Sequence, residues 1–294
     1  MDVESFLDQK FLKQLEKLKI VTKKGVKGPE RGEHKSWRSG EGLEFLDYRK
    51  YQLGDDLRYV DWSVYGRLDK LFIKLFHAEE SQTVHLLLDV SKSMGVSTQA
   101  KETSAKKIAA AVSYICLSNF DKISLIAFAD KLLEIRPLTR GKRRYPQVLN
   151  FLMSLTPDAE TDINTCLTEY ANLCKNPGIA LVMSDLFDPK GYQEGLKALT
   201  YRDFDIHLLH ILDHEELAWS RTGTLILQDI ETGAKKTTFL DSALVQLYRQ
   251  KMTGFLTETR DFCHNYGIHY YVYDTSIVFE DFLIDYLTKG AILR

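Results

Sequence analysis

The sequence predicts an α/β protein: a three-layer, Rossmann-like domain with a mainly parallel sheet, preceded by a small extended module of β structure and an N-terminal helix. Three observations predict this organisation. Apolar residues recur at helical spacing near the start of the chain, a charged and aromatic stretch follows, and short apolar runs then alternate with amphipathic segments to the end. Alternation of this last kind is typical of βαβ units, in which helices cover both faces of a parallel sheet.

The first part, residues 1–37, contains the segment FLDQKFLKQLEKLKIV near its start. Apolar side chains recur there at helical spacing beside lysines, which predicts a short amphipathic helix docked on the body of the protein. These side chains are Phe6, Leu7, Phe11, Leu15 and Leu18. The segment that follows, TKKGVKGPERGEHKSWRSG, is too rich in glycine and charge for regular structure. We expect a solvated basic loop there, in preference to a basic surface that binds a membrane or phosphate.

The second part, residues 38–79, is predicted to be a small extended module. A turn is expected at Gly54-Asp55-Asp56 and a strand at LFIKLFH. Charged and aromatic residues are dense in this part: Glu44, Asp47, Arg49, Asp55, Asp56, Arg58, Asp61, Trp62 and Arg67. A catalytic carboxylate cluster has such a composition, but so does a network of ion pairs and hydrogen bonds that supports irregular backbone. We favour the structural network.

The third part, residues 80–294, carries the alternating pattern of strands and helices. Strands are expected at TVHLLLD, DKISLIAFA, GIALVMSDL, DFDIHLLHIL and IHYYVYD. Helices are expected at KETSAKKIAAAVSYICLSNF, RRYPQVLNFLMSL, NTCLTEYANLC, GYQEGLKAL and residues 242–265. The segment GTLILQDIETGAKKTTFL departs from the alternation and predicts a hairpin insertion near residues 222–240.

The composition argues against several classes of protein. A chain of 294 residues with 44% hydrophobic and 27% charged residues is typical of globular domains, and a net charge of -2 gives no electrostatic reason for nucleic-acid binding. No apolar run approaches the roughly 18 residues of a membrane-spanning helix, and the N-terminus lacks the pattern of a signal peptide, so we expect a cytoplasmic protein without a membrane span. Four cysteines without a C-x-x-C pair are expected to be reduced core residues: Cys116, Cys166, Cys174 and Cys263.

Polar residues gather where predicted strands end. Asp89, Ser91 and Ser93 stand at the end of TVHLLLD, Thr161 precedes a helix, and Asp185 ends GIALVMSD. Ligands collect beyond the carboxyl ends of the strands in an open α/β sheet, so we expect these five side chains to converge. Their oxygens suit a hard cation such as Mg²⁺, or another divalent cation such as Mn²⁺ or Ca²⁺. The two carboxylates and three hydroxyls neutralise the charge of such a cation only partly, so that an acidic side chain of a partner can complete its coordination.

A structural interpretation of the same residues is a polar turn in which serine and aspartate cap a helix. Taken singly, each residue is a cap more often than a metal ligand. Taken jointly with Thr161 and Asp185, the serines and Asp89 favour a metal site. Lys92 and Lys101 flank the site and are expected to be solvated.

The segments D-V-S-K-S-M-G, T-D-I and S-D resemble the metal-ion-dependent adhesion site (MIDAS) of von Willebrand factor A-type (vWA) domains. All five positions of that motif are filled, by Asp89, Ser91, Ser93, Thr161 and Asp185. In that family the serines and the threonine usually contact the ion, while the aspartates act directly or through water. The resemblance therefore implies a vWA fold and cation-dependent binding of a partner protein, rather than catalysis.

A second resemblance starts at about Gly42. The run GLEFLDYRKYQLGDDLRYVDW, followed by the D-V-S-K-S-M-G element, resembles the bacterial and archaeal family known as domain of unknown function 58. Many members begin with membrane helices, which are not expected here. Genes of the family commonly lie beside a MoxR-type AAA+ ATPase, which implies an adaptor or chaperone-like partner of that ATPase or a binder of its client. An association of this kind is not a mechanism.

An enzyme is the alternative: a metal-dependent hydrolase that uses the same cation, with Asp55, Asp56 or Asp61 as the base. The D-x-D motif of haloacid-dehalogenase phosphatases is not met, because Ser91 stands where the second aspartate is needed. The chain has no G-x-x-x-x-G-K-[ST] phosphate loop, so ATP binding by the chain itself is not expected.

Three histidines, His207, His210 and His214, are close enough in the sequence to suggest zinc. Residues 207 and 210 of one strand point to opposite faces, however, so they cannot share an ion. We expect core or edge histidines.

Overall fold

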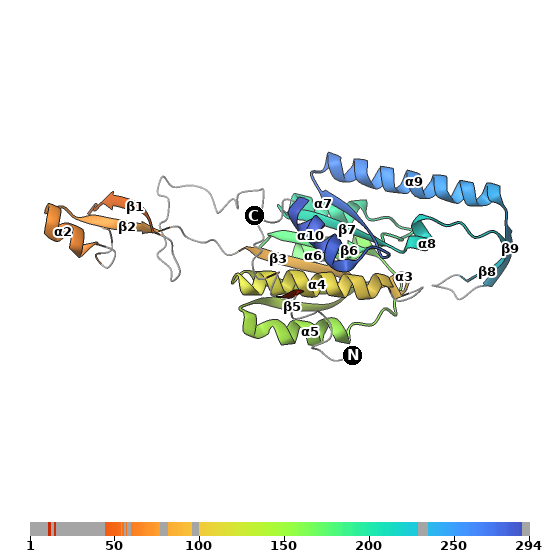
Figure 1. Cartoon of the computed structure of the whole chain (residues 1–294), viewed down its shortest axis with the longest axis horizontal. Helices are drawn as coiled ribbons and strands as arrows, with labels where there is room; N and C mark the ends of the chain where they lie inside the picture. The colour runs from red at the N-terminus through yellow and green to blue at the C-terminus, as the bar shows by residue number, and fades with distance from the viewer. Residues whose placement is uncertain are drawn as a thin grey trace. The chain divides into compact units, whose positions relative to one another are not determined.

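The computed structural model of the chain describes residues 11, 12, 15, 45–53, 55, 57, 60–76, 82–95, 100–228 and 235–289 (Figure 1). Contacts within the chain divide it into two compact units. The smaller unit is Lys27–Ser81, and the larger unit joins Met1–Val26 to Gln82–Arg294. None of the described helices is long and apolar enough to cross a bilayer.

The smaller unit contains a two-stranded sheet and a short helix. Strand β1 (Phe45–Lys50) pairs antiparallel with β2 (Phe72–Phe76), and α2 (Trp62–Leu68) lies between them in the sequence. The helix begins after Asp61 because the carboxylate of this residue accepts hydrogen bonds from two backbone N–H groups of the first turn (2.9 and 3.2 Å). The aspartate is therefore a helix cap.

Two aspartates of this unit, Asp55 and Asp61, are engaged in structural contacts. Arg49 donates to Asp55 (2.8 Å), and the Tyr48 hydroxyl donates to Asp61 (2.9 Å). The hydrogen bond from Arg49 holds the pKa of Asp55 below its ordinary value. Both carboxylates thus have the structural roles expected of a supporting network. Three other members of that predicted network lie outside the described residues: Glu44, Asp56 and Arg58.

The larger unit is built on a six-stranded sheet with the order β10-β7-β6-β3-β4-β5. Its strands are β3 (Thr83–Asp89), β4 (Lys122–Phe128), β5 (Leu132–Arg140), β6 (Ile179–Ser184), β7 (Asp205–Leu212) and β10 (His269–Asp274). Every neighbouring pair is parallel except β4 and β5. The mainly parallel sheet predicted from the sequence is confirmed. The antiparallel edge strand β5 was not predicted, because its mostly exposed residues give a weak apolar pattern.

Helices cover both faces of the sheet and complete three layers (Figure 1). One face is covered by α4 (Ala100–Ser118), α5 (Tyr145–Ser154) and α10 (Phe279–Lys289), and the other by α6 (Ile163–Leu173), α7 (Gln193–Tyr201) and α9 (Ser242–Asn265). Alternate residues of each strand enter the two cores: Leu86 and Leu88 of β3 face the first group of helices, and Leu87 faces the second. The predicted three-layer α/β fold is confirmed.

The described residues of the predicted N-terminal helix are Phe11, Leu12 and Leu15, and all three are helical. Phe11 and Leu15 are buried in the core that α4 and α10 share. The Phe11 ring meets the ring of Phe279 in α10 edge-on, with centroids 5.8 Å apart. This segment therefore packs on the α/β body as expected, while Phe6, Leu7 and Leu18 lie outside the described residues.

Shorter elements connect the layers: α3 (Lys92–Gly95), a 3₁₀ turn at Lys142–Arg144, α8 (His214–Leu217) and an antiparallel hairpin of β8 (Gly223–Gln228) with β9 (Lys235–Leu240). The four cysteines are free thiols. Three of them are buried, as expected for core residues, whereas Cys174 is half-buried.

Candidate metal centre

The candidate site begins with Asp89, the buried last residue of β3. Its Oδ1 accepts a hydrogen bond from the Ser91 backbone N–H (2.9 Å), and its Oδ2 accepts one from the Ser184 hydroxyl (2.5 Å). Ser184 is the last residue of the neighbouring strand β6. The carboxylate is therefore held in one orientation between the ends of two parallel strands.

Ser91 and Ser93 follow at the start of α3, with their hydroxyl oxygens 3.1 Å apart. Ser91 forms a parallel bridge with Ala159, and the Lys92 backbone N–H donates to the Ala159 carbonyl (2.8 Å). These backbone contacts join the end of β3 to the loop that precedes α6.

Thr161 stands in that loop, next to the N-cap of α6. The Asp162 backbone N–H donates to the carbonyl of Ala129, just beyond β4 (2.8 Å), and the Asp162 carboxylate caps the helix by accepting from the Thr165 N–H (3.0 Å). Among the described residues, the buried Thr161 hydroxyl has no hydrogen-bond partner. Because buried hydroxyls nearly always have one, this oxygen is available to a ligand.

The start of α6 also lies near the end of β3. The Cys166 thiol, one turn into α6, donates to the Ala129 carbonyl (3.3 Å). Burial raises the pKa of this thiol to about 12, and the negative charges of Asp162 and Asp89 contribute to the rise. The bridge from Ser91 to Ala159 brings the residues after Asp89 next to the segment that carries Thr161.

Asp185 directly follows β6 and is also buried. Its Oδ1 accepts from the Phe187 backbone N–H (3.1 Å), and its Oδ2 accepts from the Lys101 ammonium (2.8 Å). Burial in the first place, and the charge of Asp185 in the second, raise the pKa of Asp89 to about 6, although hydrogen bonds to two serines oppose the rise. Two carboxylates that repel each other in a buried place favour a cation between them.

Lys101, in the first turn of α4, departs from the sequence-based expectation. It was expected to be solvated, yet only 1% of it is exposed. Its Nζ donates to Asp185 (2.8 Å) and to Glu216 of α8 (2.7 Å), which compensate the buried charge. No local pattern could reveal this contact, because Glu216 lies 115 residues further along the chain. Lys92, also expected to be solvated, is partly exposed.

His210 of β7 supports the backbone at this site. Its Nε2 lies 2.9 Å from the Asp185 carbonyl, and its Nδ1 lies 2.8 Å from the Tyr270 hydroxyl. Burial lowers the pKa of His210 to about 4, so the imidazole is neutral at neutral pH. It therefore positions Asp185 without adding charge.

The segments that carry the five predicted residues meet at the carboxyl ends of β3, β4 and β6. The Lys101 ammonium contacts Asp185 and Glu216, and the charge of Asp185 acts on Asp89. When all three carboxylates are ionised they outnumber this ammonium, so the cluster has a net negative charge. The predicted donors are hard oxygen atoms of the kind that Mg²⁺ prefers. These residues fit a divalent cation, and the coordination itself stays a prediction.

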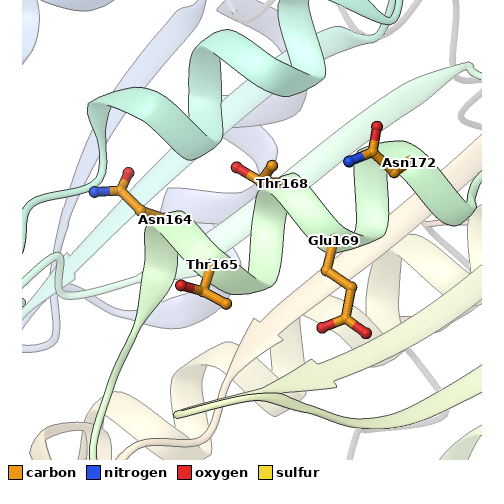
Figure 2. A pocket seen from close by; sticks show the side chains of 5 residues that line it. All are labelled: Asn164, Thr165, Thr168, Glu169 and Asn172. Carbon is orange, nitrogen blue, oxygen red and sulfur yellow. The ribbon is translucent and has the colours of Figure 1, made fainter.

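A shallow groove lies along the solvent-facing side of α6, outside this cluster (Figure 2). Its lining side chains are Asn164, Thr165, Thr168, Glu169 and Asn172. Two of them have structural contacts: Asn164 donates to the Lys190 carbonyl (3.0 Å), and Asn172 accepts from Arg202 (2.9 Å). With one charged side chain in its lining, the groove is a weaker candidate than the strand ends.

Residues 47–253, more than half of the chain, match the family described as Protein of unknown function DUF58. The chain belongs to the DUF58 family. The matched region begins in β1, ends within α9 and contains all five candidate residues. The resemblance to the DUF58 family that the sequence suggested is therefore confirmed, whereas the resemblance to a vWA metal site stays a prediction.

Curated relatives of this DUF58 protein include "Uncharacterized protein Rv1480" of Mycobacterium tuberculosis and "Uncharacterized protein Mb1516" of Mycobacterium bovis. Each is 24% identical over 243 residues, which cover 81% of this chain and 76% of the relative.

Among solved structures, the chain is similar to an aerotolerance-related membrane protein from Bacteroides fragilis (17% identity, TM-score 0.45) and to the conserved hypothetical protein BatB from Bacteroides thetaiotaomicron (17% identity, TM-score 0.43). Both comparisons cover 71% of this chain and 100% of the other. It is also similar to the pilus adhesin SpaC from Lactobacillus rhamnosus GG (14% identity, TM-score 0.45), with 73% of this chain and 30% of the adhesin covered. Likenesses at this level carry no conclusion about function.

Proposed function

We propose that this DUF58 protein binds a partner protein through a divalent cation at the strand ends, in the manner of a vWA metal-ion-dependent adhesion site. The residues that would hold the cation are Asp89, Ser91, Ser93, Thr161 and Asp185. Mg²⁺ is the expected ion, and Mn²⁺ or Ca²⁺ are members of the same oxygen-preferring class. The proposed role is binding and not catalysis.

The observation that carries the proposal is the buried Thr161 hydroxyl, which has no partner within the described part of the chain. In a purely structural turn this hydroxyl would cap the helix, but the Asp162 carboxylate already caps α6. The nearby Asp89 and Asp185 carboxylates are buried as well. A buried oxygen without a described partner, on the loop that is bridged to the end of β3, supports a cation-binding role for the turn.

The remaining hydrogen-bonding capacity of the carboxylates also supports the proposal. Asp89 and Asp185 each accept one described hydrogen bond at each of their two oxygens. An ionised carboxylate has about four acceptor positions, so both can still bind an ion directly or through water. The bound cation would supply a positive charge for an acidic side chain of the partner.

A MoxR-type AAA+ ATPase, or a client of that ATPase, is the partner that we propose, with the DUF58 protein as its adaptor or chaperone-like companion in the cytoplasm. Membership of the DUF58 family supports this choice through the gene association described above. Neither nucleic acid nor a membrane span is expected to take part.

Capture of a purified MoxR-type ATPase from the same genome by the immobilised full chain tests the proposal. We expect capture in Mg²⁺, and loss of capture in chelator, in Asp185→Asn and in Thr161→Val. Thr168→Ala, which changes a threonine in the groove of α6, is the matched control and should bind as the wild type does. Capture that is insensitive to chelator and to both site variants would contradict docking through a cation.

A further inference from the structure

We propose a second metal site in this protein, for a dication that prefers imidazole ligands, such as Zn²⁺, formed by Asp205, His207 and His269. The three residues lie at the amino ends of β7 and β10, the two strands at one edge of the sheet. This proposal is independent of the cation site described above and of the proposed function.

Strand register places the three side chains on one face of the sheet. Asp205 and His207 are two residues apart on β7, so they point to the same face. His269, the first residue of β10, is the direct parallel neighbour of His207. This face is the one covered by α4 and α10. Leu209 and Ile211, which alternate along β7 in step with Asp205 and His207, are buried in the core beneath these helices.

The ligand atoms are already close to one another. One nitrogen or oxygen from each of the three side chains lies within 4.8 Å of the other two, and His269 Nε2 is 3.7 Å from Asp205 Oδ1. The rings of His207 and His269 stack with centroids 4.5 Å apart. Tetrahedral Zn²⁺, with bonds of about 2.0 to 2.1 Å, holds its ligand atoms about 3.3 Å apart. Small side-chain rotations would therefore complete the site.

Burial makes the site partly enclosed and open on one side. Asp205 and His207 are 5% and 3% exposed, whereas the His269 side chain is 26% exposed. A buried carboxylate is stabilised by a nearby positive charge, and a dication would supply one. The exposed side, at His269, gives an ion its route of entry and leaves a coordination position for water or for a fourth ligand.

The donor set selects a different metal from the one expected at Asp89. Two imidazoles and one carboxylate suit Zn²⁺ and similar ions, whereas Mg²⁺ prefers oxygen donors alone. The two places are also distant. Asp205 pairs with Ile179 at the start of β6, and Asp185 directly follows the end of that strand, roughly 20 Å from Ile179 at about 3.3 Å per residue.

His207 and His210 were not expected to share a zinc ion because they point to opposite faces of one strand, and this opposite orientation is confirmed. His207 stacks on His269, whereas His210 contacts the Asp185 carbonyl and Tyr270 on the other face. The histidine that completes the cluster with His207 comes from another strand, and the pairing of β7 with β10 brings it into place.

Calorimetric titration of the tag-free full chain with Zn²⁺, after removal of metals by chelator, tests the second site. We expect one high-affinity ion per chain. Loss of a group that only supports a metal ligand lowers metal affinity about 10- to 100-fold. His269→Gln and Asp205→Asn remove ligands themselves, so each should lower Zn²⁺ affinity at least about 100-fold. Two controls should bind as the wild type does: His214→Gln, which changes an exposed histidine outside the cluster, and Asp89→Asn, which changes the other site.

The proposal is overturned if the wild type binds no stoichiometric Zn²⁺, if His269→Gln and Asp205→Asn bind as tightly as the wild type, or if Asp89→Asn abolishes binding while these two variants retain it. Circular dichroism checks that each variant is folded. Should the variants not fold, Co²⁺ added to the wild type decides the question. Visible absorption typical of tetrahedral nitrogen and oxygen coordination supports the site, and its absence overturns it.

Discussion

Lys101 is the residue that sets the charge balance at the strand ends. Its ammonium is held by Asp185 and Glu216, and both members of the pair with Asp185 are almost fully buried. Because a buried ammonium and a buried carboxylate compensate each other, the metal-free cluster can remain folded. Lys101 is therefore a positioning residue for Asp185, although it was expected to be solvated.

Replacement of this lysine by methionine is expected to lower the free energy of unfolding of the metal-free protein by about 3 to 5 kcal/mol, since Asp185 stays buried without its counter-ion. Added Mg²⁺ should recover part of the loss in Lys101→Met. Urea unfolding measures both effects. Lys107→Met, at a partly exposed position of the same helix, is the control and should change stability by less than about 0.5 kcal/mol. Equal unfolding midpoints for the two variants would contradict this account.

The raised pKa of Asp89 makes the stability of the metal-free protein depend on pH. Burial and the nearby Asp185 raise its pKa from 3.8 to about 6 in the folded protein. Below about pH 4 the carboxyl is protonated in both states, and above about pH 6 the folded state carries the cost of a buried charge. The contribution of Asp89 to the free energy of unfolding should therefore fall as the pH rises from about 4 to about 6, by at most about 3 kcal/mol.

Comparison with Asp89→Asn isolates this effect, because the variant lacks the titrating group while all other carboxylates remain. Urea unfolding at several pH values should show that the stability of the wild type relative to the variant decreases over this range. A difference that does not vary with pH would show that Asp89 has an ordinary pKa in the folded protein.

At the scale of elements, the start of α6 decides where Thr161 lies. The Asp162 carboxylate caps the helix, and its backbone N–H is anchored to the carbonyl of Ala129. Asp162 also accepts from the exposed Lys190 ammonium (2.6 Å). In the motif T-D-I the aspartate fixes the helix terminus, and the threonine next to it has a buried hydroxyl without a described partner.

Loss of this cap in Asp162→Ala is expected to lower the free energy of unfolding by about 1 kcal/mol, the usual effect of removing an N-cap side chain. Metal affinity should fall less than in Thr161→Val, because the backbone anchor to Ala129 is kept. Urea unfolding and calorimetry give the two values. Glu160→Ala, an exposed change two residues earlier, should leave both unchanged. A variant as stable as the wild type would mean that the cap does not support the loop.

At the scale of the whole molecule, the sequence predicted the three-layer α/β fold because strong apolar runs mark the central strands. Elements with weaker or unused signals were missed. The edge strand β5 was missed because it buries little surface and so has a weak apolar pattern. The helix α10 was missed although its buried residues Phe279, Leu283 and Tyr286 recur at helical spacing, a pattern that could have predicted it.

The candidate sites, too, could be predicted only where the sequence pattern was strong. Asp89, Ser91 and Ser93 are neighbours in the sequence, and the position of Asp185 at a strand end could be predicted from the alternation of elements. The ion pair of Lys101 with Glu216 and the stacking of His207 on His269 depend on which elements become neighbours in space. The spacing of residues along a single sequence does not show which elements become neighbours.

Binding of Mn²⁺, an ion with a magnetic resonance signal of its own, to the wild type and to Thr161→Val tests the central claim most directly. Valine keeps the shape of threonine and removes only the hydroxyl that lacks a described partner. We predict one ion per wild-type chain, an affinity at least about tenfold lower in Thr161→Val, and unfolding stability that is unchanged or higher in the variant. Equal Mn²⁺ affinity in the two proteins, or no binding by the wild type, would contradict a cation site at the strand ends.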